Sequence, residues 1–440
     1  MYDLGIKNGT VYLNGEFLNC NIYSNNGVIT NITNEDLKCK VEENAGGKLV
    51  LPGFIDPHVH FSLRVGSNIS SDDFYSGSIK GVLGGVTTYI DFLDPIKNVE
   101  EIEQAYENRM KLAEKSVSDY AFHTTIANPK STPEEIIKAS IEKGITSIKL
   151  FTTYSSTDRR TYDKYIYDLL KLSKKYNIRI VIHAENDELV SDDKKIKVRY
   201  HEVSRPVVSE VTEVLKLAEM ARETGGLLYI VHVSCGSSIK RLKECFPNEL
   251  ESKQIILESC PHYYLFNSAI YKGEDGYLYL MTPPLRPEKE RRLLYEQIDS
   301  IKTIGTDHCP FANELKNKKY TSEIAMGVGG IQYSFQNMYT EFGRKIISKF
   351  TDGPAKAYGL YPQKGSLMVG SYADIVIYDE NAKEVINDFE SIYNGKVMNG
   401  KIEKVFLRGK LISEKGKVLE SNGSYVKRRG TNLFINNSRL

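Results

Sequence analysis

The chain lacks any marked excess of charge of one sign. Its 58 lysines and arginines are matched by 57 aspartates and glutamates, which leaves a net charge of +1 over 440 residues. Such a balance gives no sign of a nucleic-acid partner or of an anionic membrane surface. No apolar run approaches the ~20 residues that a membrane-spanning helix needs, and residues 1–7 lack the apolar segment of a signal peptide. We therefore expect a cytoplasmic protein without a membrane or nucleic-acid partner.

Motifs built on paired cysteines are absent as well. The six cysteines are scattered along the chain with no C-x-x-C spacing. This pattern argues against a disulfide framework and for reduced thiols. Internal repeats and low-complexity tracts are also lacking. What remains is a chain of ordinary composition that is long enough to bury a large core.

Short β-rich runs alternate with amphipathic helical stretches from about residue 50 to residue 350. The strand-like runs cover residues 50–60, 86–92, 120–126, 145–151, 178–183, 227–233, 255–259 and 303–306. This alternation is what a parallel sheet requires. About eight such units predict an α/β fold that closes as a TIM-like (β/α)₈ barrel. We assign the barrel to residues 50–363.

The two flanks of the barrel differ from it in pattern. Residues 1–49 and 364–420 contain short alternating runs, with hairpin turns such as Asn14-Gly15 and Asn26-Gly27 in the first flank. Neither flank can bury both of its faces alone. We therefore expect one small β-sandwich domain assembled from both chain ends. The polar, basic tail over 421–440 is either frayed or docked on another subunit, and the sequence leaves both alternatives open.

Polar side chains that suit metal ions recur near the ends of the predicted strands. His58 and His60 close the first strand, and side chains two apart on a strand point the same way. One lysine, two more histidines and one aspartate follow on later strands: Lys149, His183, His232 and Asp307. The carboxyl ends of barrel strands meet on one face, where the chemistry of such barrels lies. The set predicts a two-metal site at that face.

Each of these residues has a plainer interpretation when it is taken alone. A histidine that ends an apolar run is ordinarily a hydrogen-bonded core residue, and an aspartate close before a proline can be a turn former. A lone lysine in a strand usually extends its amine to solvent. A lysine that stays buried is costly unless its charge is removed or paired. It can then react with carbon dioxide to give a carbamate, a modification that the sequence does not reveal.

The candidate ligands lie within motifs that together match a known family. The motifs are PGFIDPHVH at 52–60, KLFTTY at 149–154, HAEN at 183–186, VHVS at 231–234, ESCPHY at 258–263, MTPPLR at 281–286, GTDHCP at 305–310, PAKAYGLYP at 354–362 and GSYADIV at 370–376. With them the chain resembles the cyclic amidohydrolases of the amidohydrolase superfamily, in the dihydropyrimidinase and hydantoinase branch. The resemblance implies the barrel and sandwich fold. It also implies a metal-dependent hydrolase that opens a cyclic amide ring, either a dihydropyrimidine or a hydantoin.

The resemblance further implies two divalent metal ions, for which neutral histidines and carboxylates suit Zn²⁺ best. The family pattern places His58, His60 and Asp307 on one ion, His183 and His232 on the other, and the carbamate formed from carbon dioxide on Lys149 between them. A hydroxide that bridges the metals would attack the amide carbonyl. Asp307 would act as the acid/base, taking the proton of the hydroxide and delivering it to the leaving ring nitrogen.

The same resemblance implies a set of substrate contacts. Tyr154 would hydrogen-bond the substrate carbonyl and stabilise the oxyanion. Thr282 would offer backbone contacts to the ring, Leu63 and Phe151 would shape the pocket for the substituent, and the backbone near Gly327 would also bind substrate. The expected partner is therefore a small cyclic amide. The family also implies a homo-oligomer, either a tetramer or a dimer.

Two departures from the family pattern leave the preferred ring open. Hydantoinases usually carry an N-G-G-P-G-like turn where this chain has residues 326–332, with the sequence MGVGGIQ. Dihydroorotases would carry an arginine where this chain has Ser62, and we expect Arg64 nearby to be a solvated loop residue. An allantoinase-like enzyme, or another hydrolase of cyclic ureides or imides, is the alternative. A non-catalytic dihydropyrimidinase-related scaffold is disfavoured because all six candidate ligands are intact.

Overall fold

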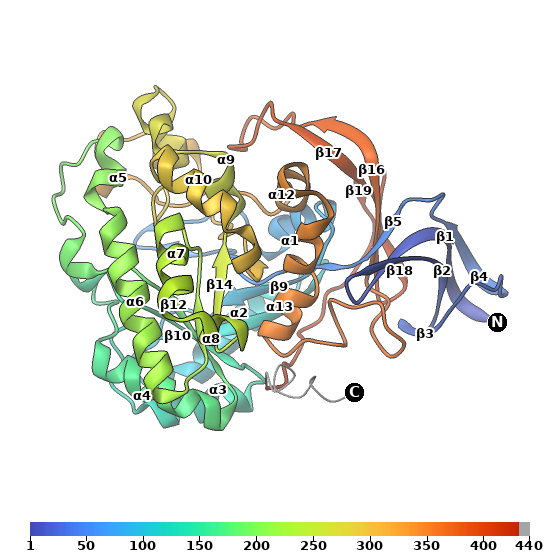
Figure 1. Cartoon of the computed structure of the whole chain (residues 1–440), viewed down its shortest axis with the longest axis horizontal. Coiled ribbons are helices and arrows are strands. Elements are labelled where there is room, and N and C mark those ends of the chain that lie inside the picture. The colour runs from blue at the N-terminus through green and yellow to red at the C-terminus, as the bar shows by residue number, and fades with distance from the viewer. Residues whose placement is uncertain (431–440) are drawn as a thin grey trace.

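Eight parallel strands form the barrel that the alternating pattern predicted (Figure 1). The computed structural model describes residues 1–430. The strands run in the order β15 (Thr303–Ile304), β14 (Ile255–Ser259), β13 (Leu228–Ile230), β12 (Arg179–His183), β11 (Ser147–Phe151), β10 (Asp119–Thr125), β9 (Val86–Phe92) and β6 (Phe54–Asp56). A parallel bridge between Val59 and His308 joins the segments that follow the first and last strands. The prediction of a (β/α)₈ barrel is confirmed.

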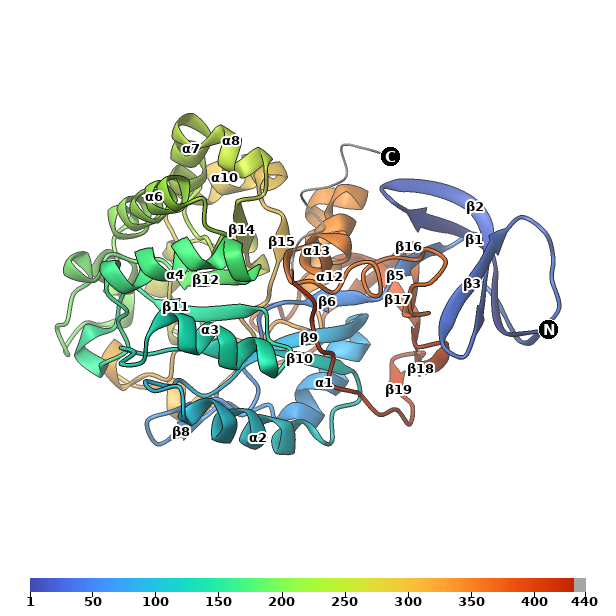
Figure 2. The ribbon, with the colours of Figure 1, turned by 90° about the horizontal axis from the view of Figure 1, so that it is seen from below.

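Helices surround the barrel (Figures 1 and 2). They are α1 (Phe74–Leu83), α2 (Glu101–Ala113), α3 (Pro133–Glu142), α4 (Asp163–Tyr176), α5 (His201–Ser204), α6 (Val207–Thr224), α7 (Gly236–Cys245), α8 (Pro247–Glu251), α9 (Pro261–Leu265), α10 (Glu288–Glu296), α11 (Asn313–Lys316), α12 (Ser334–Phe342) and α13 (Asp352–Ala357). Long helices such as α4 follow strands whose outward residues, among them Ile148 and Leu150, are fully buried. None of the helices in residues 1–430 has both the length and the apolarity needed to span a bilayer.

The prediction of one strand over residues 50–60 was wrong, because the run divides at Gly53. The first part, β5 (Leu49–Pro52), belongs to the sheet formed by the chain ends, and only β6 belongs to the barrel. A methyl group at Gly53 would lie 2.2 Å from Thr87 Oγ1, so the chain crosses close over β9 at this point. Glycine is the residue that permits such an approach. His58 and His60 consequently lie just beyond the end of β6.

Both chain ends contribute to one β domain, as predicted. Its strands form a single nine-stranded, mainly antiparallel sheet: β1 (Tyr2–Leu13), β2 (Glu16–Asn25), β3 (Val28–Thr33), β4 (Cys39–Asn44) and β5 from one end, and β16 (Ile375–Val385), β17 (Val397–Leu407), β18 (Lys410–Glu414) and β19 (Lys417–Val418) from the other. The Ile29 N–H donates to Ser371 O at 2.8 Å, just before β16. The sheet therefore curls back on itself around a core that includes Ile6, Ile22 and Ile375. A separate two-stranded ribbon, β7 (Arg64–Val65) with β8 (Asn68–Ile69), lies after the first histidines.

The tail docks on the barrel of its own chain over residues 421–430. The Tyr120 N–H donates to Ser424 O at 3.1 Å, and the Val426 N–H donates to Tyr120 O at 2.7 Å. Figure 2 shows this red stretch crossing from the β domain onto the barrel. Neither a frayed tail nor docking on another subunit describes these ten residues. The prediction for residues 431–440 lies outside the described part of the chain.

A buried ion cluster ties the barrel, the β domain and the tail together. Asp119 of β10 accepts hydrogen bonds from Lys364 Nζ at 2.8 Å, from the Arg408 guanidinium and from the Ser424 N–H at 2.8 Å. The same Lys364 ammonium contacts the Asp374 carboxylate at 2.5 Å. Lys364 and both carboxylates are buried. Separation of any one partner would leave a buried charge without compensation, so the cluster holds the three parts of the chain in one arrangement.

Candidate active site

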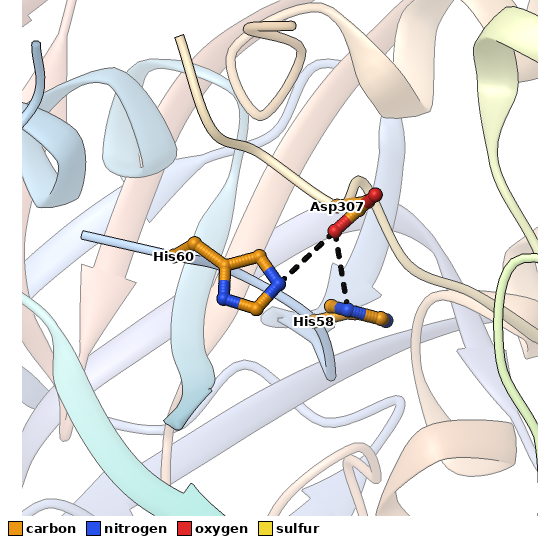
Figure 3. A group of neighbouring side chains, drawn as sticks. All are labelled: His58, His60 and Asp307. Carbon is orange, nitrogen blue, oxygen red and sulfur yellow. Dashed lines mark ion pairs between the residues drawn. The ribbon is translucent and has the colours of Figure 1, made fainter. Parts of the chain in front are cut away.

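Three of the predicted ligands converge at the carboxyl face of the barrel. His58 Nε2 lies 3.2 Å from Asp307 Oδ1, and His60 Nε2 lies 3.1 Å from the same oxygen. Figure 3 shows both imidazoles directed at this carboxylate from the segment after β6, while Asp307 follows β15. Within residues 1–430 these are the residues whose ligand atoms gather closely enough to hold a metal ion together.

Buried acids that the sequence analysis did not single out orient this group. Glu258 Oε1 lies 2.7 Å from His58 Nδ1, which leaves Nε2 free to face Asp307. Asp56 accepts hydrogen bonds at 3.1 Å from the backbone N–H groups of both His58 and Thr306. Burial acts to lower the pKa of His58, but the carboxylates of Glu258 and Asp307 outweigh it and raise that pKa to about 9. The glutamate was detectable in principle, since it is a charged residue inside the apolar strand β14.

The other two predicted histidines form a second group beside the first. The rings of His183 and His232 lie 4.6 Å apart, and the His232 ring lies 5.5 Å from that of His58. His183 Nε2 lies 2.6 Å from Glu185 Oε2, so its Nδ1 remains available as a ligand atom. Coordinating histidines in proteins characteristically hold such a carboxylate on their other nitrogen.

Lys149 lies inside the barrel below these histidines and is 2% exposed. Its Nζ is 5.4 Å from the ring centres of both Phe92 and Phe151. Among the described residues no side chain forms an ion pair or hydrogen bond with this amine. Burial lowers its pKa to about 8, against the opposing effect of Asp307 and Glu258. The lowered pKa favours the neutral amine, and the neutral form is the one that reacts with carbon dioxide.

The residues at the carboxyl face fit a divalent metal ion. Among the described residues five buried ring nitrogens have no hydrogen-bond partner: both of His262, and His58 Nε2, His60 Nδ1 and His232 Nδ1 at the site itself. Unpaired polar atoms at this depth are costly unless something absent from the polypeptide satisfies them. The donor set of imidazoles and a carboxylate, with a lysine that carbon dioxide can convert to an anion, suits Zn²⁺ and related ions.

Three residues of this site have strained backbone conformations. His232, Asp307 and Tyr154 have φ angles of 39°, 50° and 72°, in the left-handed region that side chains with a Cβ rarely adopt. Such conformations persist only where the surrounding structure holds them, and they cluster at functional sites. The turns place these three side chains over the barrel mouth instead of along the strands.

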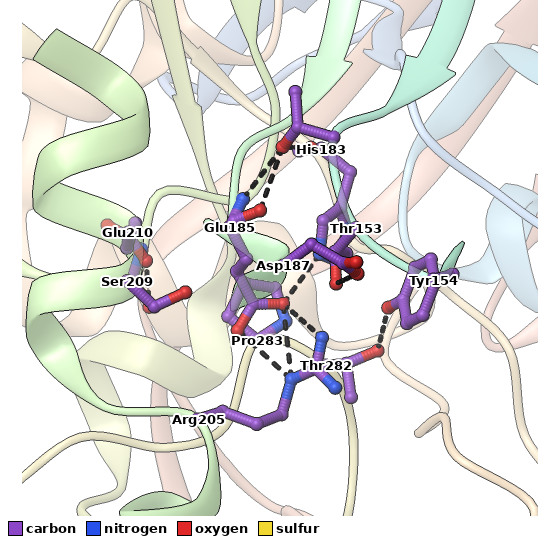
Figure 4. Close-up of polar contacts among 12 residues, drawn as sticks. Thr153, Tyr154, His183, Glu185, Asp187, Arg205, Ser209, Glu210, Thr282 and Pro283 are labelled. Carbon is purple, nitrogen blue, oxygen red and sulfur yellow. Dashed lines mark hydrogen bonds and ion pairs between the residues drawn. The ribbon is translucent and has the colours of Figure 1, made fainter. Parts of the chain in front are cut away.

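Tyr154 meets Thr282 beside His183 (Figure 4). The two hydroxyls lie 2.7 Å apart, and the Tyr154 ring lies 5.2 Å from that of His183. Arg205, which clasps Glu185 with its guanidinium at 2.6 Å, has that group 5.3 Å from the centre of the Tyr154 ring. Burial raises the pKa of Tyr154, so its hydroxyl keeps its proton and can donate it. The contact between Tyr154 and Thr282 joins two residues that the sequence analysis had treated separately.

The remaining predicted substrate contacts occupy different surroundings. Phe151 lies beside Lys149 and Tyr154, whereas Leu63 packs on a small apolar cluster that contains Cys309, Phe311 and Ala325. Gly327 uses both of its backbone groups inside the chain: its N–H donates to Leu280 O at 2.9 Å, and its carbonyl accepts from Lys316 Nζ at 2.5 Å. Its role in substrate binding stays a prediction. Arg64 is exposed on β7, as expected for a solvated residue.

Known proteins resemble this chain in sequence and fold over nearly its whole length. The sequence profile of the amidohydrolase family matches residues 49–412. The chain is 30% identical to the D-hydantoinase of Geobacillus stearothermophilus, with 96% of each chain covered. It is also 30% identical to the D-phenylhydantoinase of Escherichia coli O1:K1, over 98% of this chain and 97% of the relative. The solved structure of a D-hydantoinase (dihydropyrimidinase) from Thermus sp. has a TM-score of 0.89 at 29% identity and covers 97% of this chain and 99% of that one.

A barrel with histidines and an aspartate gathered at its carboxyl face is typical of barrel hydrolases that use metal ions. Within that class, the chain belongs to the amidohydrolase family and is a cyclic amidohydrolase of the hydantoinase branch.

Proposed function

We propose that the protein opens the ring of a dihydropyrimidine or a hydantoin by hydrolysis, with two divalent metal ions held by the six residues predicted from the sequence. The observation that carries the proposal is Lys149, a buried lysine without a partner among the described residues, beneath four neighbouring histidines and Asp307. Conversion of its amine to a carbamate would remove the unpaired charge and supply two ligand oxygens at the point where the two histidine groups meet.

Metal ions bound there would lower the pKa of a water molecule and polarise the amide carbonyl. The chain's own residues would move the proton. The neighbouring imidazoles of His58 and His60 hold the pKa of Asp307 well below its usual range despite burial, so its carboxylate is ionised at neutral pH. An ionised carboxylate at this place can accept a proton from the attacking water and pass it to the ring nitrogen as the C–N bond breaks.

Tyr154 would act on the carbonyl oxygen of the substrate. Its hydroxyl is held at 2.7 Å from Thr282 Oγ1, beside the ring of His183. A donor that is fixed before the reaction stabilises the negative charge that develops on this oxygen without further reorganisation. In this proposal Thr282 orients the Tyr154 hydroxyl in addition to contacting the substrate ring.

Replacement of Tyr154 by phenylalanine tests that role. The Tyr154→Phe variant should keep its fold and its full metal content, because the hydroxyl contacts Thr282 and none of the candidate ligands. We expect kcat to fall by ~10²–10³, with KM little changed, since the donor acts mainly in the transition state. Steady-state kinetics on the best cyclic substrate measures this split. Tyr165→Phe, which removes a hydroxyl bonded to Ser131 O away from the site, is the matched control. A Tyr154→Phe variant with the kcat of the unmodified protein would remove Tyr154 from the mechanism.

A panel of substrates will identify the ring that the enzyme prefers. Dihydropyrimidines, hydantoins, allantoin and cyclic imides should be compared by kcat/KM under one set of metal conditions. We expect the highest value for a dihydropyrimidine or a hydantoin. A clear preference for allantoin would favour the allantoinase-like alternative. That alternative is compatible with residues 326–332, which differ from the usual turn of hydantoinases. Assembly as a dimer or tetramer and a cytoplasmic location are part of the same proposal.

A further inference from the structure

The described end of the chain is wedged between two barrel strands. Strands β10 and β11 pair through Thr124 with Ile148 and through Thr125 with Lys149, at the carboxyl end of β10. Toward the amino ends of the two strands, the tail forms backbone hydrogen bonds with both of them. Tyr120 of β10 pairs with residues 424–426, and the Arg428 N–H donates to Gly144 O at 3.0 Å, just ahead of β11. The segment over 424–428 thus joins β10 to the start of β11.

From this segment the side chain of Arg428 enters the barrel. The residue is 4% exposed, and its guanidinium lies 5.6 Å from the centre of the Tyr358 ring. Its Nη2 donates to Phe122 O and, at 2.9 Å, to Ser147 Oγ. No carboxylate pairs with it within residues 1–430, although an uncompensated buried charge is costly. The free-energy cost of burying the Arg428 charge indicates that this side chain does more than fill space in the barrel.

A directed column of hydrogen bonds leads from Arg428 toward the candidate active site. Ser147 Oγ lies 2.5 Å from His123 Nδ1, and His123 Nε2 lies 3.0 Å from Pro57 O. Because a carbonyl can only accept, His123 Nε2 carries the proton and Nδ1 accepts. Ser147 must therefore donate to His123 and accept from Arg428. Each donor in such a chain polarises the next, and the cation at its lower end reinforces the whole column.

Two members of the column, Pro57 O and Ser147, lie next to candidate metal ligands. Pro57 O belongs to the peptide bond that joins Pro57 to His58. Ser147 lies two residues before Lys149 on β11, so both side chains point into the barrel. The column therefore contacts the segment that carries His58 and His60 and the strand that carries Lys149. It is buried throughout, with Ser147 and His123 both at 0% exposure.

We propose that Arg428 of the C-terminal segment is a positioning residue for the active site, which fixes β11 with Lys149 and the peptide bond ahead of His58 through Ser147 and His123. This role rests on the proposed function for its effect on catalysis. Its effect on the strand itself does not depend on which substrate is hydrolysed.

The test compares two adjacent arginines in the full-length, metal-loaded protein. Arg428→Met removes the buried donor and keeps the apolar stem, whereas Arg429→Met removes the same charge from an exposed side chain. For Arg428→Met we expect kcat to fall about tenfold at unchanged KM, the lower end of the effect of residues that orient ligands. We also expect a lower metal content per chain and faster hydrogen–deuterium exchange in peptides over 145–151. Arg429→Met should match the unmodified protein in all three measurements.

Two further variants keep the proposal testable if Arg428→Met does not fold. Ser147→Ala breaks the column and leaves the tail intact, so it should reproduce the fall in kcat. Arg428→Lys retains a cation and a donor and should recover part of the rate. Unchanged exchange over 145–151 together with unchanged kcat in Arg428→Met would overturn the proposal, as would a lower melting temperature with full kcat. If the unmodified protein opens no cyclic amide, the proposed function fails, while exchange and metal content still test Arg428.

Discussion

The Lys149→Ala variant should lose both metal ions and all measurable ring-opening activity. In the proposed site the carbamate of Lys149 is the ligand that the two histidine groups share, so its removal affects both ions together. The buried amine has no other partner among the described residues that its loss would leave unsatisfied, and the fold should survive. Elemental analysis of the purified variant and steady-state kinetics measure the two losses. Lys171→Ala, at an exposed position of α4, is the control and should behave as the unmodified protein.

The same variant offers a rescue that a purely structural lysine would not. Short-chain carboxylates can enter the space left by the lysine side chain and supply two oxygens in place of the carbamate. Part of the metal content and of the activity should return when such a carboxylate is added with Zn²⁺. If Lys149→Ala retains both ions and its rate, the lysine is not a ligand. The charge cost of burying it would then require another explanation.

The Asp307→Asn variant should lose activity while it keeps part of its metal. An amide preserves the shape of the side chain and one ligand oxygen, but it cannot take a proton from water. General acid–base catalysis contributes ~10²–10⁴ to a rate, so kcat should fall by at least that factor. The short contacts from His58 and His60 to Oδ1 show how closely the rest of the group depends on this residue, and some loss of metal affinity should accompany the change.

Kinetics at matched metal occupancy separates the two effects in Asp307→Asn. The rate per occupied site should stay low at saturating Zn²⁺ if Asp307 moves the proton. A rate per occupied site that returns to that of the unmodified protein would reduce Asp307 to a ligand. Asp275→Asn, which alters an exposed aspartate, is the control for the general effect of this substitution.

Local sequence pattern was sufficient for the barrel and for the position of the candidate ligands. Strands β9 and β14 occupy the predicted residues 86–92 and 255–259, because buried parallel strands are continuous apolar runs with clear ends. Residues that follow such runs must meet at one face of a closed barrel. That is why His58, His183 and His232 lie together in the structure although they are far apart in sequence.

Contacts between distant segments were beyond such reasoning. The break at Gly53 depends on how closely the chain crosses Thr87, and the docking of the tail depends on backbone hydrogen bonds to β10 and to the segment ahead of β11. The acid Glu258 acquires its role only when the fold brings it to within 2.7 Å of His58 Nδ1, 200 residues away in sequence. A charged residue within an apolar strand, as at Glu258, is a signal that sequence analysis can use.

Metal titration of ring opening tests the central claim most directly. The protein should be stripped with a chelator and then reloaded with increasing Zn²⁺ in bicarbonate buffer, while bound metal and the hydrolysis of a dihydropyrimidine and a hydantoin are measured together. The account predicts no activity in the stripped protein and a rate that rises until about two ions are bound per chain. Full ring-opening activity in stripped protein that holds less than about 0.3 ion per chain would contradict it.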